Sequence, residues 1–245
     1  MNATAVLFPS LAEPKAKETQ GAKERNSGVV RGSDGRVRPA WVGKDPLLED
    51  YYDNEWGRVV TDGKDLFELQ SLLVFQAGLR WKSVLLRRPR LRAACQGFSV
   101  GYLSLLEEED IDRLMQDDRM IRNRQKIAAV VGNAKAVRNL EGYPGGLAEL
   151  VWSFQPERTP CPVYVEDIPA SIPESVALAK ELKSRGFSFV GPKNCFALMQ
   201  AAGVVDTNPL DSENRGLTGL WDKQGNRVGR PKIPGTSDTN THDVR

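Results

Sequence analysis

Apolar residues recur at helical spacing through the middle of the chain, and this spacing most constrains its fold. Spacings of three and four residues, with no convincing alternation of period two and no repeat of fixed length, are typical of amphipathic helices. The apolar segments are 66–76, 85–94 with a break at Pro89, 111–114, 127–134, 147–154, 176–182 and a final helix that starts after Pro192. The pattern predicts an all-α fold.

The two ends of the chain lack this periodicity. Residues 1–38 are rich in charged residues, Gly and Ser, and residues 221–245 are similarly polar, so we expect a disordered leader and a disordered tail around one helical domain at 39–220. No apolar run is long enough to span a bilayer, and the first residues lack the basic start of a secretory signal.

The scarcity of histidine and cysteine excludes several kinds of chemistry. The one histidine, His242, lies in the polar tail, which argues against histidine-assisted nucleophilic catalysis and against a histidine metal site in the domain. Cys95, Cys161 and Cys195 are far apart, which favours three reduced thiols over a disulfide framework. The net charge of only +2 does not by itself indicate nucleic-acid binding.

Large aromatic residues gather early in the domain. Tyr52 lies among Trp41, Tyr51, Trp56 and Trp81, at a loop-like spacing with polar residues interleaved. Such a cluster can stack on a planar ring, or it can simply be an aromatic core between helices.

Two basic stretches and one acidic run follow. Arginines and a lysine crowd 80–92, and Arg122, Arg124 and Lys126 precede an apolar helix, where they can bind phosphate or form a solvated charged face. The acidic residues 107–110 favour the start of a helix.

Together, these segments resemble the 3-methyladenine DNA glycosylase I family from about Pro39 to Val205. The most specific matches are the strings Asp53-Asn54-Glu55-Trp56-Gly57 and Gln76-Ala77-Gly78-Leu79-Arg80-Trp81. Further matches are Leu66-Phe67-Glu68, Ile121-Arg122-Asn123-Arg124-Gln125-Lys126-Ile127, Gly132-Asn133-Ala134, Trp152-Ser153-Phe154, Phe189-Val190-Gly191-Pro192 and Met199-Gln200-Ala201.

The resemblance implies a helix-hairpin-helix fold that clamps DNA phosphates and flips an alkylated base into an aromatic pocket. By matching position, the residues that would line this pocket are Trp41, Tyr51, Trp56 and Trp81. The residues that would contact DNA are Arg119, Arg122, Arg124 and Lys126.

The chain departs from the family in three places. The family ties its termini together with a zinc held by two cysteines and two histidines, whereas the matching positions here are Pro39, Tyr52, Asn208 and Ser212, so we expect no metal and no other cofactor. Leu73 stands where the family has a glutamate that helps to recognise the base, which leaves the catalytic residue unknown. Arg119 replaces a hairpin glycine, either straining the turn or adding a phosphate contact.

The sequence therefore predicts a metal-free, monofunctional glycosylase that removes alkylated purines, 3-methyladenine foremost, from double-stranded DNA. We expect a monomer with no membrane contact, cytoplasmic at the nucleoid or nuclear in a eukaryote. Asp53 is the nearest carboxylate in a matching motif, but a cap or core role suits it better than that of a general base. Because of Leu73, two alternatives remain: a non-catalytic DNA-binding paralogue, and a glycosylase tuned to a bulkier or less polar adduct.

Overall fold

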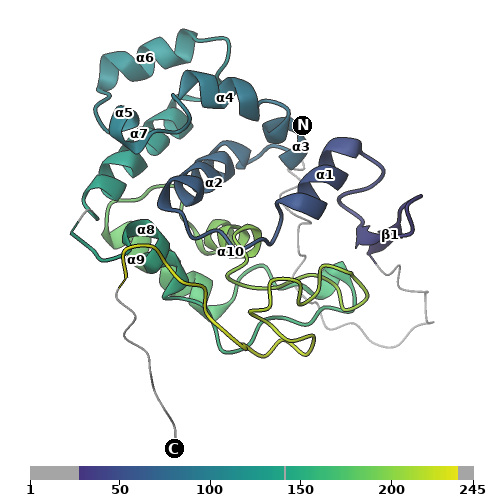
Figure 1. Cartoon of the computed structure of the whole chain (residues 1–245). Helices are drawn as coiled ribbons and strands as arrows, with labels where there is room; N and C mark the ends of the chain where they lie inside the picture. Colours follow the sequence, from purple (N-terminus) through teal and green to yellow (C-terminus); the bar gives the residue numbers. More distant parts are fainter. Residues whose placement is uncertain (1–27, 141, 237–245) are drawn as a thin grey trace, which may run out of the picture.

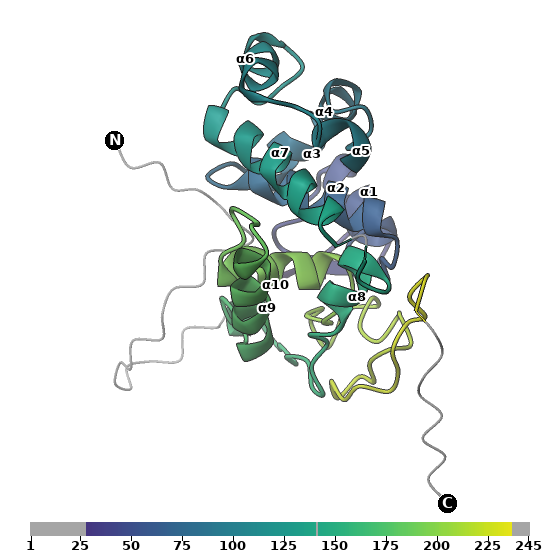
Figure 2. The ribbon, with the colours of Figure 1, turned by 90° about the vertical axis from the view of Figure 1, so that its left-hand side faces the viewer.

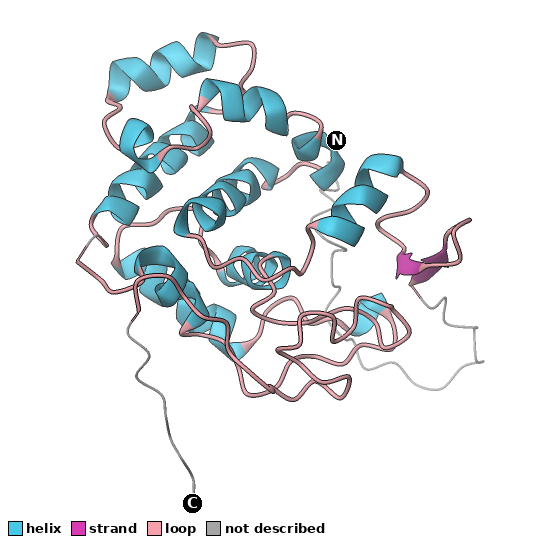
Figure 3. Cartoon of the chain, viewed as in Figure 1, coloured by secondary structure: helices cyan, strands magenta, loops and turns pink. Residues whose placement is uncertain are grey.

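A computed structural model describes residues 28–140 and 142–236, and their architecture is helical (Figure 1). A two-stranded hairpin precedes the helices, with β1 and β2 paired antiparallel so that Val30 lies opposite Arg38 (Figure 3). The elements in chain order are β1 (Val29–Arg31), β2 (Val37–Pro39), α1 (Pro46–Asn54), α2 (Gly63–Gln76), α3 (Trp81–Leu85), α4 (Arg88–Ala94), α5 (Val100–Leu103), α6 (Glu108–Gln116), α7 (Arg124–Arg138), α8 (Gly146–Trp152), the 3-10 turn η1 (Val165–Asp167), α9 (Pro173–Ser184) and α10 (Pro192–Ala201).

Helix α2 forms the centre of the domain. It begins at the N-cap Asp62, whose carboxylate accepts from the backbone N–H groups of Lys64 and Asp65, and every residue from Leu66 to Gln76 except Leu69 is buried. Helices α3, α7, α8 and α10 all pack against it. A helix that is buried on every side has neighbours all round, which agrees with its central position (Figures 1 and 2).

The helices predicted from the apolar spacing are confirmed, with one difference. The predicted break in the 85–94 repeat is present: α3 ends at Leu85, and Pro89 lies in the first turn of the next helix, α4, where a missing N–H costs nothing. Tyr51 and Tyr52 lie on α1, so the prediction that they belong to a loop was wrong; Asp45 caps this helix and Pro46 begins it. The acidic run starts α6 as predicted, with a capping box between Glu107 and Asp110.

The predicted boundaries of the leader and the tail were wrong for the residues that the structure describes. The hairpin covers Val29–Arg31 and Val37–Pro39, and Arg38 is buried. At the other end, Trp221 is 2% exposed and Ile233 is 4% exposed, so this segment packs on the domain despite its polar composition. Sparse apolar residues suffice here because the backbone of the segment pairs with residues 157–159. Residues 1–27 and 237–245 lie outside the described part of the chain.

Two pairs of consecutive helices have the hairpin arrangement. Helices α6 and α7 pack together, and so do α9 and α10. The turn between α9 and α10 holds Phe189, which is 38% exposed and adopts a left-handed φ of 58°. Only the first pair was singled out as a hairpin from the sequence. Among the described residues, no helix is both long and apolar enough to cross a membrane.

Candidate functional site

The four aromatic residues singled out in the sequence form one contiguous cluster. Trp41 packs edge-on against Trp56, with ring centroids 5.6 Å apart. Tyr51 lies 6.2 Å from Trp56 and 5.4 Å from Trp81, so the rings follow one another from the loop before α1 to the start of α3. The helix α1 turns Tyr51 towards α3, while Trp56 follows the end of α1 and Trp81 is the first residue of α3.

The aromatic cluster borders a cavity on one side and the apolar core on the other. A cavity of about 370 Å³ is lined by Tyr51 and Trp81, but not by Trp41 or Trp56. Tyr51, Trp56 and Trp81 are each no more than 6% exposed. Burial raises the pKa of the Tyr51 phenol well above its usual value, so this hydroxyl stays protonated and can donate a hydrogen bond. The two interpretations of the cluster thus apply to different members of it: Tyr51 and Trp81 line the cavity, whereas Trp56 belongs to the core and Trp41 packs against the core.

A buried carboxylate on the cavity wall was not singled out from the sequence. Glu68 of α2 is 3% exposed, and its carboxylate accepts from Arg88 Nε at 2.8 Å and pairs with Arg92 Nε at 3.5 Å. Arg88 also pairs with Glu55 at 2.5 Å, which ties α4 to the end of α1. A glutamate within the apolar repeat that starts at Leu66 was the available signal, because a buried charge needs a partner.

Leu73 lies on the same helix but away from this cavity. It is 1% exposed and does not line the cavity, whereas its neighbour Leu72 does. Its backbone carbonyl accepts a hydrogen bond from Asn194 Nδ2 at 3.3 Å. At the position of the family's glutamate, the chain therefore places an apolar side chain in the core.

The residues predicted to contact DNA do not form one free cationic patch. Arg119 is bound by Asp117, and Arg124 pairs with Glu108 and Asp112 across the hairpin. Arg122 is exposed and has no ion pair among the described residues.

Lys126 was wrongly assigned to this surface. It is 6% exposed, and its ammonium donates to backbone carbonyl groups of α2 instead of facing solvent. Arg119 has no positive φ, so its place at the family's glycine does not strain the turn. Of the four predicted DNA contacts, Arg122 alone combines exposure with freedom from ion pairs in the described structure.

Most of the earlier basic stretch is also engaged within the domain. Lys82 pairs with Asp45, Arg90 pairs with Asp118 at 2.7 Å, and Arg87 donates to the carbonyl of Ser83 at 3.1 Å. Carboxylates from outside this stretch thus pair with Lys82 and Arg90 in a run that contains only basic charges. The run is mainly a set of links between helices.

Three of the four positions that match the family's zinc ligands come together in the structure. The Tyr52 hydroxyl donates to Asn208 Oδ1 at 2.7 Å and lies 2.8 Å from Ser212 Oγ, and all three residues are buried. Asn214 adds a bond from its Nδ2 to the backbone carbonyl of Tyr52 at 3.2 Å. We call Tyr52, Asn208, Ser212 and Asn214 the terminal clasp.

The clasp does not fit a zinc ion. Burial raises the pKa of the Tyr52 phenol well above its usual value, and the amide and hydroxyl of Asn208 and Ser212 are weak ligands for zinc. The fourth position, Pro39, has no side-chain donor atom. No group of three or more His, Cys, Asp or Glu residues that could hold a metal occurs among the described residues.

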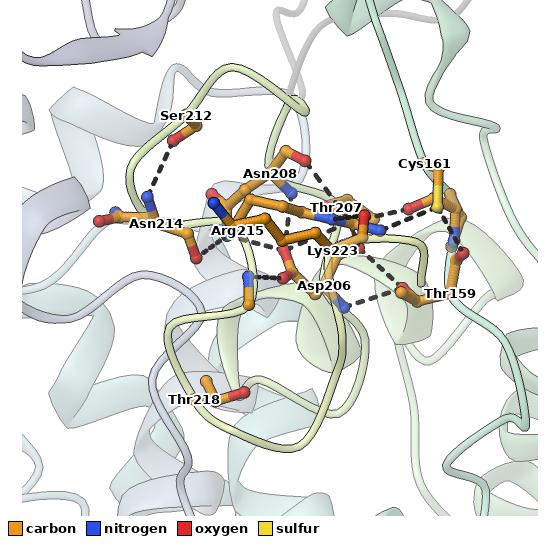
Figure 4. Close-up of polar contacts among 12 residues, drawn as sticks. Thr159, Cys161, Asp206, Thr207, Asn208, Ser212, Asn214, Arg215, Thr218 and Lys223 are labelled. Atoms are coloured by element: carbon orange, nitrogen blue, oxygen red, sulfur yellow. Dashed lines mark hydrogen bonds and ion pairs between the residues drawn. The ribbon is translucent and has the colours of Figure 1, made fainter. Parts of the chain in front are cut away.

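The clasp continues into a larger buried network (Figure 4). Asp206 accepts from Asn208 Nδ2 at 2.9 Å and from the backbone N–H of Gly216 at 2.7 Å. Arg215 donates to the carbonyl of Asp206 at 2.6 Å and to Cys161 Sγ at 2.9 Å. These bonds fold residues 206–216 into a compact loop on which Tyr52 docks.

Ion pairs from the β-hairpin reinforce the same junction. Arg38 binds Asp34 at 2.6 Å and Asp53 at 2.5 Å, while Arg36 reaches both Asp53 at 2.8 Å and Glu213 at 3.2 Å. Asp53 is therefore saturated by arginine donors, which agrees with a core role and not with that of a general base.

The cysteines are all unpaired in the described structure. Cys95 and Cys195 are buried, and burial raises the pKa of each thiol to about 12, so neither is a ready nucleophile. Cys161 is exposed and accepts from Arg215. The expectation of three thiols without a disulfide framework is confirmed.

Comparison with known proteins identifies relatives of this chain. The sequence pattern of the methyladenine glycosylase family matches residues 41–214. DNA-3-methyladenine glycosylase 1 of Escherichia coli (strain K12) is 44% identical over 172 residues, which are 69% of this chain and 91% of that protein. The crystal structure of a 3-methyladenine DNA glycosylase I superposes with a TM-score of 0.66 at 42% identity, over 69% of this chain and 94% of the other.

A third relative was solved to show how 3-methyladenine is recognised. This 3-methyladenine DNA glycosylase I from Staphylococcus aureus is 30% identical, with a TM-score of 0.66 over 69% of this chain and 92% of its own. The family pattern covers most of the helical domain, and the relatives are matched along nearly their whole length. The chain belongs to the methyladenine glycosylase family.

Proposed function

We propose that this protein is a monofunctional DNA glycosylase that removes alkylated purines, 3-methyladenine foremost, by flipping them out of the duplex. The observation that carries the proposal is the pairing of Tyr51 and Trp81 on the wall of a cavity of about 370 Å³, a volume typical of small-molecule sites. Flipped bases are held by aromatic side chains in enzymes that act on them.

The chemistry suits a site that lacks a strong base. Methylation at N3 gives adenine a positive charge, so the ring stacks well on electron-rich aromatic faces. When the glycosidic bond breaks, the bonding electrons leave with the base and neutralise it. Water then adds to C1′ and releases one proton. Because the leaving group is already activated, the protein supplies fewer kcal/mol than a normal base would require.

DNA affinity is proposed to lie on the face that carries the α6–α7 hairpin. Arg122 is exposed there without an ion pair among the described residues, while Arg119 and Arg124 can exchange their carboxylate partners for phosphate oxygens. We propose double-stranded DNA as the substrate, a monomer as the active form, and the compartment that holds the genome as the location.

The protein is further proposed to work without zinc. The support is the chemistry of the terminal clasp, in which a protonated phenol, an amide and a hydroxyl bond to one another. Elemental analysis of the purified protein should find less than stoichiometric zinc, and a chelator should leave base release unchanged. A full equivalent of tightly bound zinc would overturn this part of the proposal.

The experiment for the main activity is direct. Duplex DNA treated with a methylating agent is incubated with the protein, and released bases are separated by chromatography. We expect 3-methyladenine among them, with weaker discrimination against 7-methylguanine than a relative with glutamate at the position of Leu73 gives, because stacking favours any cationic purine. Absence of any released base at high enzyme concentration would refute the proposal.

Leu73 favours a second candidate function, a DNA-binding paralogue that recognises lesions without cleaving them. The side chain is apolar, so it can neither accept a hydrogen bond from the base nor offset its charge. A lost charge-assisted hydrogen bond of this kind costs about 1.5–3 kcal/mol. If the wild type and Leu73→Glu both release no base but bind methylated duplex better than unmodified duplex, this candidate replaces the first.

A further inference from the structure

Two side chains from distant helices hold the C-terminal end of α2. Lys126 Nζ donates to the carbonyl of Phe75 at 2.8 Å and also to that of Ala77. Asn194 Nδ2 donates to the carbonyl of Leu73 at 3.3 Å. The last carbonyls of a helix have no partner within it, so these contacts satisfy groups that would otherwise be left open.

The electrostatics of this contact favour a cation. The C-terminus of a helix carries a partial negative charge, which stabilises an ammonium group placed against it. Lys126 is 6% exposed, and burial lowers the pKa of its ammonium. An ammonium that is buried against two carbonyl groups is not available to a DNA phosphate.

The end of α2 determines where Trp81 lies. After Gln76 the chain reverses in a short turn, in which Gly78 has a φ of 78° and the N–H of Leu79 donates to the carbonyl of Gln76 at 2.6 Å. Trp81 then begins α3 and packs 5.4 Å from Tyr51 on the cavity wall. Because this short turn leads directly to Trp81, a shift of the end of α2 would also shift Trp81 relative to Tyr51.

We propose that Lys126 is a positioning residue, which fixes the end of α2 and so places Trp81 for stacking on the flipped base. The proposal rests on the proposed glycosylase function. Lys126 lies in the first turn of α7, which begins directly after Arg122 and the N-cap Asn123. The first turn of α7 therefore connects the α6–α7 hairpin, where DNA is proposed to bind, with Tyr51 and Trp81.

The test separates positioning from phosphate contact with three variants. Lys126→Met keeps the length and apolar stem of the side chain but removes the ammonium. Lys135→Met is the matched control, since Lys135 is a half-exposed lysine of the same helix that pairs with Glu107. Arg122→Ala provides the reference for how much duplex affinity and its salt dependence change when one phosphate contact is lost.

Three quantities are measured on each variant. They are the single-turnover rate of 3-methyladenine release at saturating protein, the salt dependence of binding to undamaged duplex, and hydrogen exchange of the amides of Ala77 and Leu79. For Lys126→Met we expect release to slow at least tenfold and exchange to speed up at least tenfold, with duplex affinity within twofold and an unchanged salt slope. Lys135→Met should match the wild type in all three.

Opposite results would overturn the proposal. A salt slope reduced by about 0.9, as one lost phosphate contact gives, together with unchanged exchange would restore Lys126 to the DNA surface. If Lys126→Met does not fold, Lys126→Arg, which keeps a cation and several donors, must retain slow exchange, or the proposal is wrong. If the wild type releases no base, the glycosylase function fails, whereas the exchange and salt measurements still decide the role of Lys126.

Discussion

Removal of one hydroxyl from the terminal clasp tests how the two ends of the domain are joined. Tyr52→Phe keeps the ring, which is 1% exposed, but deletes the oxygen that donates to Asn208 Oδ1 at 2.7 Å and lies 2.8 Å from Ser212 Oγ. Asn208 Oδ1 is then left buried, with no other partner among the described residues. An orphaned buried acceptor costs about 1–3 kcal/mol.

This loss is large enough to measure by calorimetry. For a domain of this size, 1 kcal/mol shifts the melting temperature by about 2–4 °C, so we expect Tyr52→Phe to melt roughly 2–12 °C lower than the wild type. Tyr102→Phe is the matched control, because Tyr102 is partly buried and its hydroxyl has no hydrogen bond in the described structure. Each protein is scanned with and without a chelator, which should change neither melting temperature.

Two results would refute the reasoning. If Tyr52→Phe melts within about 1 °C of the wild type, the hydroxyl contributes little and the clasp is only a set of neighbours. If the chelator lowers the melting temperature of the wild type, a metal contributes to the stability of the protein, and the hydrogen bonds do not replace it.

The remaining predictions concern the site. Leu73→Glu should lower stability because the position is buried, and it should leave release of 3-methyladenine unchanged because Leu73 does not line the Tyr51–Trp81 cavity; release that speeds up about tenfold, equivalent to about 1.4 kcal/mol, would show that the base binds beside position 73 and not in that cavity. Trp81→Ala should slow release about 100-fold, as 2–3 kcal/mol of lost stacking implies, with undamaged duplex still bound within twofold; equal losses in both would mean that Trp81 only supports the fold. Arg122→Ala should weaken binding on every duplex and reduce the salt slope by about 0.9, and an unchanged slope would exclude the phosphate contact. Glu68→Gln should lower the free energy of unfolding by roughly 1–3 kcal/mol, measured in urea, because Arg88 then has Glu55 as its remaining carboxylate partner. An unchanged free energy would show that the Arg88–Glu68 ion pair contributes nothing to stability.

Local patterns predicted the elements well because helix formation depends on neighbouring residues. The apolar spacing from Leu66 to Gln76 identified α2, and the acidic run at 107–110 identified the start of α6. Short polar segments were predicted less well. The hairpin Gly28–Pro39 and the segment around Trp221 owe their order to contacts with residues far away in the chain, such as Asp53 and Glu157.

The sequence by itself determined the fold class and the family, through apolar spacing and the strings around Trp56 and Trp81. It also determined that the zinc ligands and the pocket glutamate of the family are missing. Only the tertiary structure decided which charges face solvent. In the sequence, Lys126 and Arg124 are both cations beside the start of a helix, yet Lys126 is buried against α2 whereas Arg124 is exposed. Tyr52 and Asn208 likewise became partners across 156 residues. The physical reason is that the cost of burying a polar group is met by whichever donor or acceptor the fold brings within 3 Å, and neighbouring residues do not specify that partner.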